Sequence, residues 1–220
     1  MRAGKPTVEK TRVLIVDDHP MTRSGLVHVI NHQPELIVCG EAESAAQALD
    51  ILDSSRPDLL LIDITLPGKS GLELIKDVKA MHPELLMLVV SMHDESLYAD
   101  RVLRAGARGY ITKHEGGEKL VEAIRHVLSG KIYVSESMSA HILEIFSGGQ
   151  TRLDRSSIEK LSDREFEVFE SLGEGLSSQQ IAKKLHLSAK TVDAHRANIK
   201  TTAELISYAA RWTSHRAQTE

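Results

Sequence analysis

The chain has 220 residues, of which 41% are hydrophobic and 26% charged, and its formal net charge is −4. This length suits two ordinary domains, and no apolar stretch approaches the roughly 18 residues that a membrane-spanning helix needs. The single cysteine, Cys39, excludes a disulfide within the chain. It lies in an apolar run, which favours a buried position in a cytoplasmic protein. A slightly acidic chain gives no argument of its own for a nucleic-acid partner.

The N-terminal half alternates between short apolar runs and amphipathic segments. Runs that are apolar on both faces belong in a parallel sheet covered by helices on each side. We therefore predict an α/β domain over residues 12–130, with a five-stranded parallel sheet and five helices, after an extension at 1–11. The strands should begin near Val13, Leu36, Leu59, Leu86 and Tyr110, and the helices should cover 22–31, 44–54, 71–81, 96–105 and 118–129.

Polar residues follow four of the five predicted strands. Asp17 and Asp18 follow the first strand, Asp63 the third, Ser91 the fourth and Lys113 the fifth. Each of these residues alone is usually a turn former, a helix cap or a solvated charge. Ligands in sheets of this kind bind beyond the carboxyl ends of the strands, which is where all five residues lie. Their shared position favours one site over five unrelated roles.

The residue types of this site suit a metal ion and a phosphoryl group. Mg²⁺ prefers hard oxygen ligands, which Asp17, Asp18, Asp63 and the backbone carbonyl of Thr65 can supply. The carboxylate of Asp63 can also act as a nucleophile on phosphorus and form an acyl phosphate. The metal and Lys113 would offset the charge on the transferred group. The hydroxyl of Ser91 would then hydrogen-bond one of its oxygens.

Residues 10–130 closely resemble the receiver domains of bacterial two-component response regulators. The matching residues are Val16–Pro20, Ile62–Gly68, Ser91 and Gly109–Lys113. The resemblance implies a flavodoxin-like fold, a Mg²⁺ cofactor and phosphorylation of Asp63 by a sensor histidine kinase. It also implies that Ser91 and Tyr110 move together when the phosphoryl group arrives. His114 departs from the family pattern, because many receivers have proline there.

Residues 131–157 have the composition of a linker, and 158–220 have a wholly helical pattern. Met138–Phe146 could form a short helix, and Ser147–Thr151 would act as a hinge. Ser162 followed by Glu165 is a capping box that should open the next helix. No regular strand pattern follows it. We therefore predict a linker with a short helix and then a small all-α domain.

Two short helices joined by a tight turn in this domain predict a helix-turn-helix. The first helix would cover 177–185, and the recognition helix would begin near Ser188. An ordinary helical bundle with a mixed-charge surface is the alternative, and charge alone favours it. On the first interpretation, basic side chains would bind phosphates, and Asp193 could accept from cytosine. The predicted DNA-binding residues are Ser188, Lys190, Thr191, Asp193, Ala194, His195, Arg196 and Lys200.

Three further motifs make this segment similar to the LuxR-type effector domain of the NarL/FixJ regulators. They are Leu161–Glu165, Gly175–Ala182 and Leu187–Ile199. The resemblance implies transcription control by dimers on paired half-sites. The chain departs from the family after Lys200, where roughly six residues are missing from the helix-turn-helix pattern. The recognition helix would then be short, or a single helix would run from Ser188 to Trp212 and invite a swapped dimer.

These observations leave two functions open. The first is a phosphorylation-dependent, DNA-binding transcription regulator that dimerises when phosphorylated and acts in the cytoplasm without a membrane partner. It would not be an enzyme, apart from slow self-dephosphorylation. The alternative is a phospho-receiver that signals through protein contacts because the shortened region after Lys200 impairs its DNA-binding module.

Overall fold

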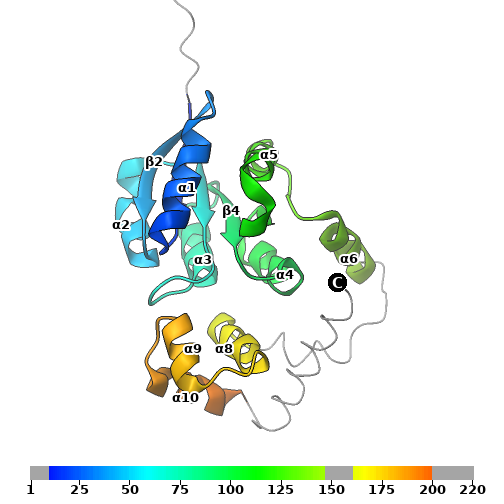
Figure 1. Cartoon of the computed structure of the whole chain (residues 1–220). Helices are drawn as coiled ribbons and strands as arrows, with labels where there is room; N and C mark the ends of the chain where they lie inside the picture. Colours follow the sequence, from blue (N-terminus) through cyan, green and yellow to red (C-terminus); the bar gives the residue numbers. More distant parts are fainter. Residues whose placement is uncertain (1–9, 147–160, 200–220) are drawn as a thin grey trace, which may run out of the picture. The chain divides into compact units, whose positions relative to one another are not determined.

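The computed structural model describes residues 10–146 and 161–199. The chain divides into two compact units, 1–143 and 144–220, and each is described by itself. The first unit is a five-stranded parallel sheet with the strand order β2-β1-β3-β4-β5 (Figure 1). Its strands are β1 (Thr11–Val16), β2 (Leu36–Ala42), β3 (Leu59–Ile62), β4 (Leu86–Ser91) and β5 (Gly109–Thr112).

Helices connect successive strands of this sheet. A continuous apolar core joins one face of the sheet to α1 and α5, through Leu26 and Ile30 of α1 and Leu120 and Ile124 of α5. Helix α3 contacts both α2 and α4. The helices are α1 (Pro20–Asn31), α2 (Ala45–Ser55), α3 (Gly71–Met81), α4 (Glu95–Ala105) and α5 (Gly116–Leu128), with a short 3₁₀ turn, η1 (Lys113–Glu115), before α5. The predicted α/β fold is therefore confirmed.

Local sequence explains where the helices start, and why α1 and α4 begin slightly earlier than the periodicity predicts. Pro20 occupies the first turn of α1, where its fixed φ suits a helix and its missing N–H is not needed. The side chain of Asp94 caps α4 by accepting from the N–H of Ser96. Ser70 and Glu73 form a complete capping box on α3. These caps satisfy N–H groups that have no partner within the helix.

The chain after α5 stays attached to the first unit. Tyr133 pairs with the outer edge of β5 in a parallel bridge to Gly109. Helix α6 (Glu136–Phe146) follows, close to the predicted short helix, and the division between the two units falls inside it. The predicted hinge at 147–151 lies outside the described residues.

The described part of the second unit contains three short helices. Val168, Phe169, Ile181, Val192 and Ile199 belong to their shared apolar core. Ser162, Ser177 and Ser188 cap the three helices through their side chains, and the first two form capping boxes. The helices are α8 (Asp163–Gly173), α9 (Ser178–Lys184) and α10 (Ala189–Asn198).

The prediction of one helix from Ser188 to Trp212 is wrong. Helix α10 ends at Asn198, and Ile199 leaves the helical region with φ −69° and ψ 85°. The side chain of Ile199 is only 2% exposed and packs in the core of this unit, so ending the helix here allows that residue to be buried. The recognition helix is thus anchored at its C-terminal end. Lys200 and the residues after it lie outside the described residues.

Candidate phosphoacceptor and metal site

Four neighbouring strands bring the predicted site residues to one edge of the sheet. In the order β1-β3-β4-β5, Val16 pairs with Ile62, and Ser91 pairs with Thr112. The N–H of Asp63 donates to the carbonyl of Val16 at 2.9 Å, which fixes the backbone of Asp63 beside the end of β1. Parallel strands in this register place their carboxyl ends together. Asp17, Asp63 and Lys113 therefore meet although they are far apart in the sequence.

Two buried aspartates share one lysine at this edge. Asp17 is 1% exposed and Asp63 4%. The ammonium of Lys113 lies 2.8 Å from Asp17 Oδ2 and 2.6 Å from Asp63 Oδ2. One positive charge cannot balance two carboxylates, so the cluster keeps excess negative charge. That excess favours a further cation in a buried place, where screening by water is weak.

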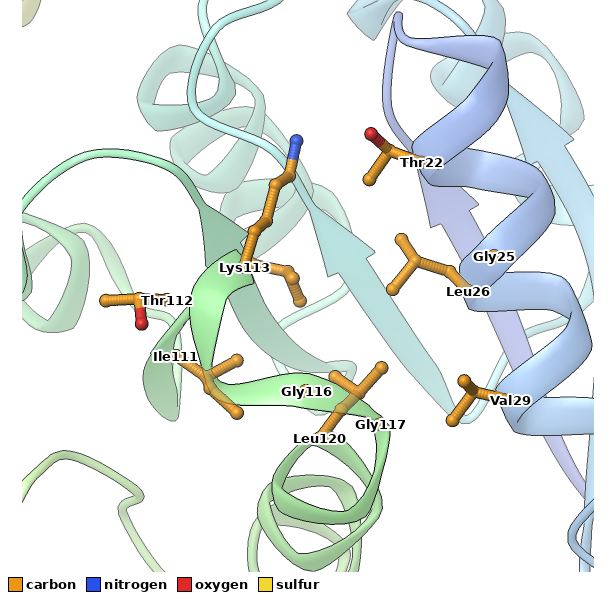
Figure 2. A pocket seen from close by; sticks show the side chains of 11 residues that line it. Thr22, Gly25, Leu26, Val29, Ile111, Thr112, Lys113, Gly116, Gly117 and Leu120 are labelled. Carbon is orange, nitrogen blue, oxygen red and sulfur yellow. The ribbon is translucent and has the colours of Figure 1, made fainter.

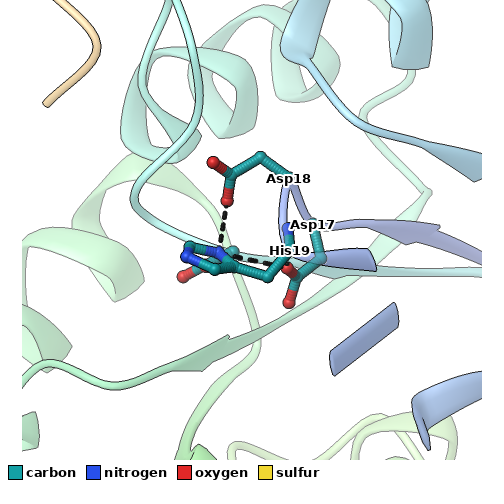
Figure 3. A group of neighbouring side chains, drawn as sticks. Asp17, Asp18 and His19 are labelled. Atoms are coloured by element: carbon teal, nitrogen blue, oxygen red, sulfur yellow. Dashed lines mark hydrogen bonds and ion pairs between the residues drawn. The ribbon is translucent and has the colours of Figure 1, made fainter. Parts of the chain in front are cut away.

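Asp18 and His19 complete the cluster (Figure 3). Asp18 Oδ1 lies 2.6 Å from His19 Nδ1, and the backbone N–H of His19 donates to Asp17 Oδ1 at 2.8 Å. One potential ligand atom from each of Asp17, Asp18, His19 and Asp63 lies within 4.8 Å of the others. Three carboxylates this close suit Mg²⁺. His19 had no predicted role from the sequence. Its position directly after Asp17 and Asp18 and before Pro20 was the sequence feature that could have indicated one.

The pKa shifts of Asp63 and Lys113 follow from their burial and from their charges. Burial raises the pKa of Asp63 above its ordinary value of 3.8, and the positive charge of Lys113 only partly offsets this effect. Burial alone would lower the pKa of Lys113, but its contacts with Asp63 and Asp17 raise that pKa instead. The two directions agree, because the lysine gains two anionic partners while Asp63 shares that lysine with Asp17. The ionised Asp63 is therefore costly without a further cation.

This arrangement predicts a pH-dependent stability difference between the wild type and Asp63→Asn. A carboxyl whose pKa is raised on folding makes the free energy of unfolding decrease as pH rises from 3.8 through the folded pKa. The amide of the asparagine variant does not titrate, so the free energy of unfolding does not fall for this reason in the variant. In Mg²⁺-free buffer, its advantage in Tm should be absent below pH 3.8 and largest above the folded pKa. Thermal unfolding across this pH range measures it, and a gap that narrows with rising pH would contradict the burial argument.

His93 joins Ser91 and Tyr110, although it too had no predicted role. The N–H of His93 donates to the hydroxyl of Ser91 at 3.3 Å, and its carbonyl accepts from the hydroxyl of Tyr110 at 2.8 Å. Its ring nitrogen Nε2 lies 2.9 Å from the hydroxyl of Thr65. Ser91 and Tyr110 are both buried. One residue in the loop after β4 thus links the predicted hydroxyl, the predicted switch tyrosine and the loop that follows Asp63.

Gly71 holds the backbone behind the acceptor in place. Its N–H donates to the carbonyl of Ile64 at 2.8 Å. A Cβ at this position would lie 2.0 Å from the carbonyl oxygen of Asp63 and 2.9 Å from Cα of Ile64. Only glycine permits the start of α3 to approach the acceptor segment so closely. The position of Asp63 therefore depends on a residue eight places further along the chain.

A small groove lies beside this site, between α1 and α5 (Figure 2). Its volume is about 150 Å³, and apolar side chains such as Leu26, Val29 and Leu120 line it, with Thr22 and Lys113 at its polar end. Pockets that enclose small-molecule substrates usually measure about 300–1,000 Å³. At about 150 Å³, this groove is smaller than such a pocket.

Seven of the eight predicted DNA-binding residues belong to the described part of the chain, Ser188 as the N-cap of α10 and the other six within that helix. Lys200 lies outside the described residues. Lys190, Asp193 and Ala194 are exposed, while Thr191, His195 and Arg196 are half-buried. Asp193 Oδ1 accepts from the hydroxyl of Ser178 at 2.7 Å, and Arg196 Nη1 donates to the hydroxyl oxygen of Ser178 at 2.5 Å. Ser178 therefore ties the recognition helix to α9. Asp193 and Arg196 would have to exchange this contact before they could bind bases or phosphates.

Both units match known families. Residues 13–125 match the response regulator receiver domain, and residues 159–202 match the family of bacterial regulatory proteins called luxR. The chain belongs to the two-component response regulators with a LuxR-type DNA-binding domain. The helix-turn-helix interpretation of the second unit is thereby confirmed over the ordinary bundle.

Relatives in this response-regulator family match almost the whole chain. The oxygen regulatory protein NreC of Staphylococcus epidermidis is 33% identical over 211 residues, covering 91% of this chain and 97% of that protein. NreC of Staphylococcus carnosus is 31% identical over 210 residues, with the same coverage of both chains. The match to both relatives continues through the two units, so the chain has the family's domain organisation.

Solved structures of response regulators agree with this membership. RcsB of Salmonella enterica serovar Typhimurium, bound to promoter rprA with the phosphomimetic BeF3-, has a TM-score of 0.62 and 26% identity, covering 92% of this chain and 99% of that chain. A LuxR-family two-component response regulator from Aurantimonas sp. has a TM-score of 0.59 and 32% identity, covering 63% of this chain and 99% of that chain. Within residues 10–146 and 161–199, no helix is long and apolar enough to span a membrane.

Proposed function

We propose that Asp63 is the phosphoacceptor through which this response regulator controls transcription, and that the helix-turn-helix around α10 binds DNA. The observation that carries this is the buried Asp63, held 2.6 Å from the ammonium of Lys113 and beside Asp17 and Asp18 at the carboxyl edge of the sheet. The family supplies the coarse function, phosphorylation-dependent transcription regulation.

The phosphoryl group would come from a phosphohistidine of a sensor histidine kinase. An oxygen of the Asp63 carboxylate attacks phosphorus, a P–O bond forms, and the P–N bond breaks with its electron pair returning to the imidazole. Lys113 would bind an oxygen of the transferred group, and Ser91 would donate to another. Asp17, Asp18 and Asp63, with the backbone carbonyl of Thr65, would hold Mg²⁺, which neutralises negative charge when bound. Water would then slowly hydrolyse the acyl phosphate, releasing inorganic phosphate and regenerating the Asp63 carboxylate.

The second unit would bind double-stranded DNA as a homodimer on paired half-sites. RcsB supports this assembly, because its solved structures include two dimers bound to two parallel DNAs. Lys190 is exposed at the start of α10, where a positive charge suits a phosphate. The alternative, a DNA-binding module disabled after Lys200, has no supporting observation, since Val192 and Ile199 pack α10 into the core. A DNA-binding regulator of this family would act in the cytoplasm.

Footprinting with acetyl phosphate and Mg²⁺ tests this function. The phosphorylated chain should protect paired sites about one DNA turn apart in genomic fragments. Lys190→Ala should weaken binding to all sequences alike and reduce the salt dependence by about one phosphate contact. Lys76→Ala, on α3 of the first unit, is the matched control. Phosphorylated protein that protects no fragment, at any salt concentration tested, would remove the proposal for α10.

Magnesium should stabilise the wild type through the acidic cluster. A ligand at 100 times its Kd adds about 2.7 kcal/mol to the free energy of unfolding. Asp18→Asn should lose most of that gain, because Asp18 is one of three carboxylates that converge on the site. Asp53→Asn removes an exposed carboxylate elsewhere and should keep the gain. Thermal unfolding with and without MgCl₂ gives the comparison, and equal shifts in all three proteins would place the metal elsewhere.

A further inference from the structure

The segment after α5 forms an additional edge of the sheet, directly beside the strand that carries Tyr110. The N–H of Tyr133 donates to the carbonyl of Arg108 at 3.0 Å, and the N–H of Tyr110 donates to the carbonyl of Tyr133 at 2.9 Å. The ring of Tyr133 lies edge-on to the ring of His126 on α5, with the centroids 5.7 Å apart. The beginning of the predicted linker is therefore fixed on the first unit from two sides.

The sequence provides room for this contact at Gly109. A Cβ on Gly109 would lie 2.8 Å from the carbonyl oxygen of Tyr133 and 3.1 Å from its Cβ. The nearest of these atoms, the carbonyl oxygen of Tyr133, belongs to the backbone, so it cannot move aside as the end of a flexible side chain can. Any other residue at 109 would push the segment away from β5. The close approach of Tyr133 to the strand of Tyr110 therefore depends on Gly109.

Helix α4 holds the same segment two residues further on. The backbone N–H of Ser135 donates to Glu95 Oε1 at 2.8 Å. Glu95 is the first residue of α4, two residues after His93, whose carbonyl accepts from the hydroxyl of Tyr110. Hydrogen bonds to a carboxylate are stronger than those between neutral groups. The strand of Tyr110 and the start of α4 therefore both hold residues 133–135.

Helix α6 begins at the end of this held segment. The hydroxyl of Ser135 accepts from the N–H of Met138 at 3.1 Å, and its carbonyl accepts from the N–H of Ser139 at 2.9 Å. The side chain of Met138 is buried. A displacement of Ser135 would therefore change the first turn of α6, the helix in which the two units divide. The segment between α5 and α6 is thus hydrogen-bonded to the first unit at Tyr133 and Ser135, directly before α6 begins.

We propose that residues 133–135 are a coupling element that transmits the state of Tyr110 and α4 to α6, and that Glu95 is its positioning residue. This inference rests on the proposed function, because it takes phosphorylation of Asp63 as the input and DNA binding as the output. When Tyr110 and the start of α4 change position, the two anchors on Tyr133 and Ser135 change together. The start of α6 then has one position in each state of the receiver. Phosphorylation therefore changes the preferred position of the helix that precedes the DNA-binding unit in the chain.

Glu95→Ala in the full chain tests the coupling element. Glu95→Gln keeps an acceptor oxygen at the same place, and Asp100→Ala removes a carboxylate from the same helix that pairs with Arg104 at the surface. For each protein, intact mass gives the fraction phosphorylated by acetyl phosphate with Mg²⁺. Hydrogen exchange gives the protection of the Tyr133 and Ser135 amides. Titration of a footprinted DNA gives the ratio of affinities with and without phosphorylation.

Glu95→Ala should be phosphorylated like the wild type, because Glu95 does not touch the acidic cluster. Its Ser135 amide should exchange faster, and the affinity ratio should fall by about tenfold, the effect of losing one charge-assisted hydrogen bond. Asp100→Ala should keep both properties. Glu95→Gln keeps the acceptor oxygen without its charge, so both properties should lie between those of the wild type and those of Glu95→Ala. An unchanged affinity ratio in a fully phosphorylated Glu95→Ala protein, or unchanged exchange at Ser135, would overturn the coupling element alone. A wild type that is not phosphorylated, or whose affinity ignores phosphorylation, would instead overturn the function on which it rests.

Discussion

An Asp63→Asn chain should accept no phosphoryl group from acetyl phosphate or from a kinase, while it keeps its fold. The amide is a far weaker nucleophile than the carboxylate and leaves fewer oxygens for Mg²⁺. The side chain keeps nearly the same volume in a site that is 4% exposed, and Lys113 keeps its contact with Asp17. Labelling should slow by at least about 100-fold, which corresponds to an activation free energy higher by about 2.7 kcal/mol or more. Intact mass after treatment with acetyl phosphate measures it.

Asp58→Asn is the matched control for this experiment. Asp58 and Asp63 flank the same strand, β3, at opposite ends, and Asp58 accepts from the backbone N–H of Arg12 at 2.8 Å. Asp58→Asn removes one negative charge, as Asp63→Asn does, but at the opposite end of β3. The Asp58→Asn chain should therefore be phosphorylated like the wild type. Persistent labelling of Asp63→Asn, or equal loss in both variants, would remove Asp63 from the role of acceptor.

Gly71→Ala should destabilise the first unit and slow labelling, although glycine to alanine within a helix usually stabilises by about 0.5–1 kcal/mol. The new Cβ would lie 2.0 Å from the carbonyl oxygen of Asp63. Since that obstacle is backbone, either α3 or the acceptor segment has to move. Overpacking of this kind costs about 1–3 kcal/mol or more in the free energy of unfolding. Urea unfolding and the initial rate of labelling give the two effects.

Gly25→Ala separates this local clash from the general effect of a glycine substitution. Gly25 lies on α1, and a Cβ there meets no atom within 4 Å. Its variant should be as stable as the wild type or more stable, and should label at the normal rate. If Gly71→Ala behaved like Gly25→Ala, the close approach between α3 and the acceptor backbone would not constrain the site.

The sheet and the acidic cluster could be predicted because their signals are local. Four of the five strands contain a short run that is apolar on both faces, and the site residues come directly after these runs. Asp17, Asp63 and Lys113 therefore meet once the strand order is known. The helix starts were less accurate, because the caps at Pro20 and Asp94 lie outside the periodic apolar pattern.

Other features depend on contacts that the sequence pattern does not contain. His93 acquires its place from Thr65, Ser91 and Tyr110, three residues in three other segments. The helix that could have run on from Ser188 ends at Asn198 because Ile199 is buried, and no glycine or proline marks that end. Tyr133 looked like part of a linker because a single bridge to Gly109 has no periodicity. Tertiary packing decides all three cases.

The affinity of the full chain for one footprinted DNA, measured before and after phosphorylation of the same sample, tests the central claim most directly. Titration by fluorescence anisotropy with Mg²⁺ and acetyl phosphate should show tighter binding for the wild type and Asp58→Asn. Asp63→Asn should show the same affinity under both conditions. Tighter binding by Asp63→Asn after the treatment, or no change in a wild type whose mass shows one added phosphoryl group, would contradict control of the DNA-binding unit through Asp63.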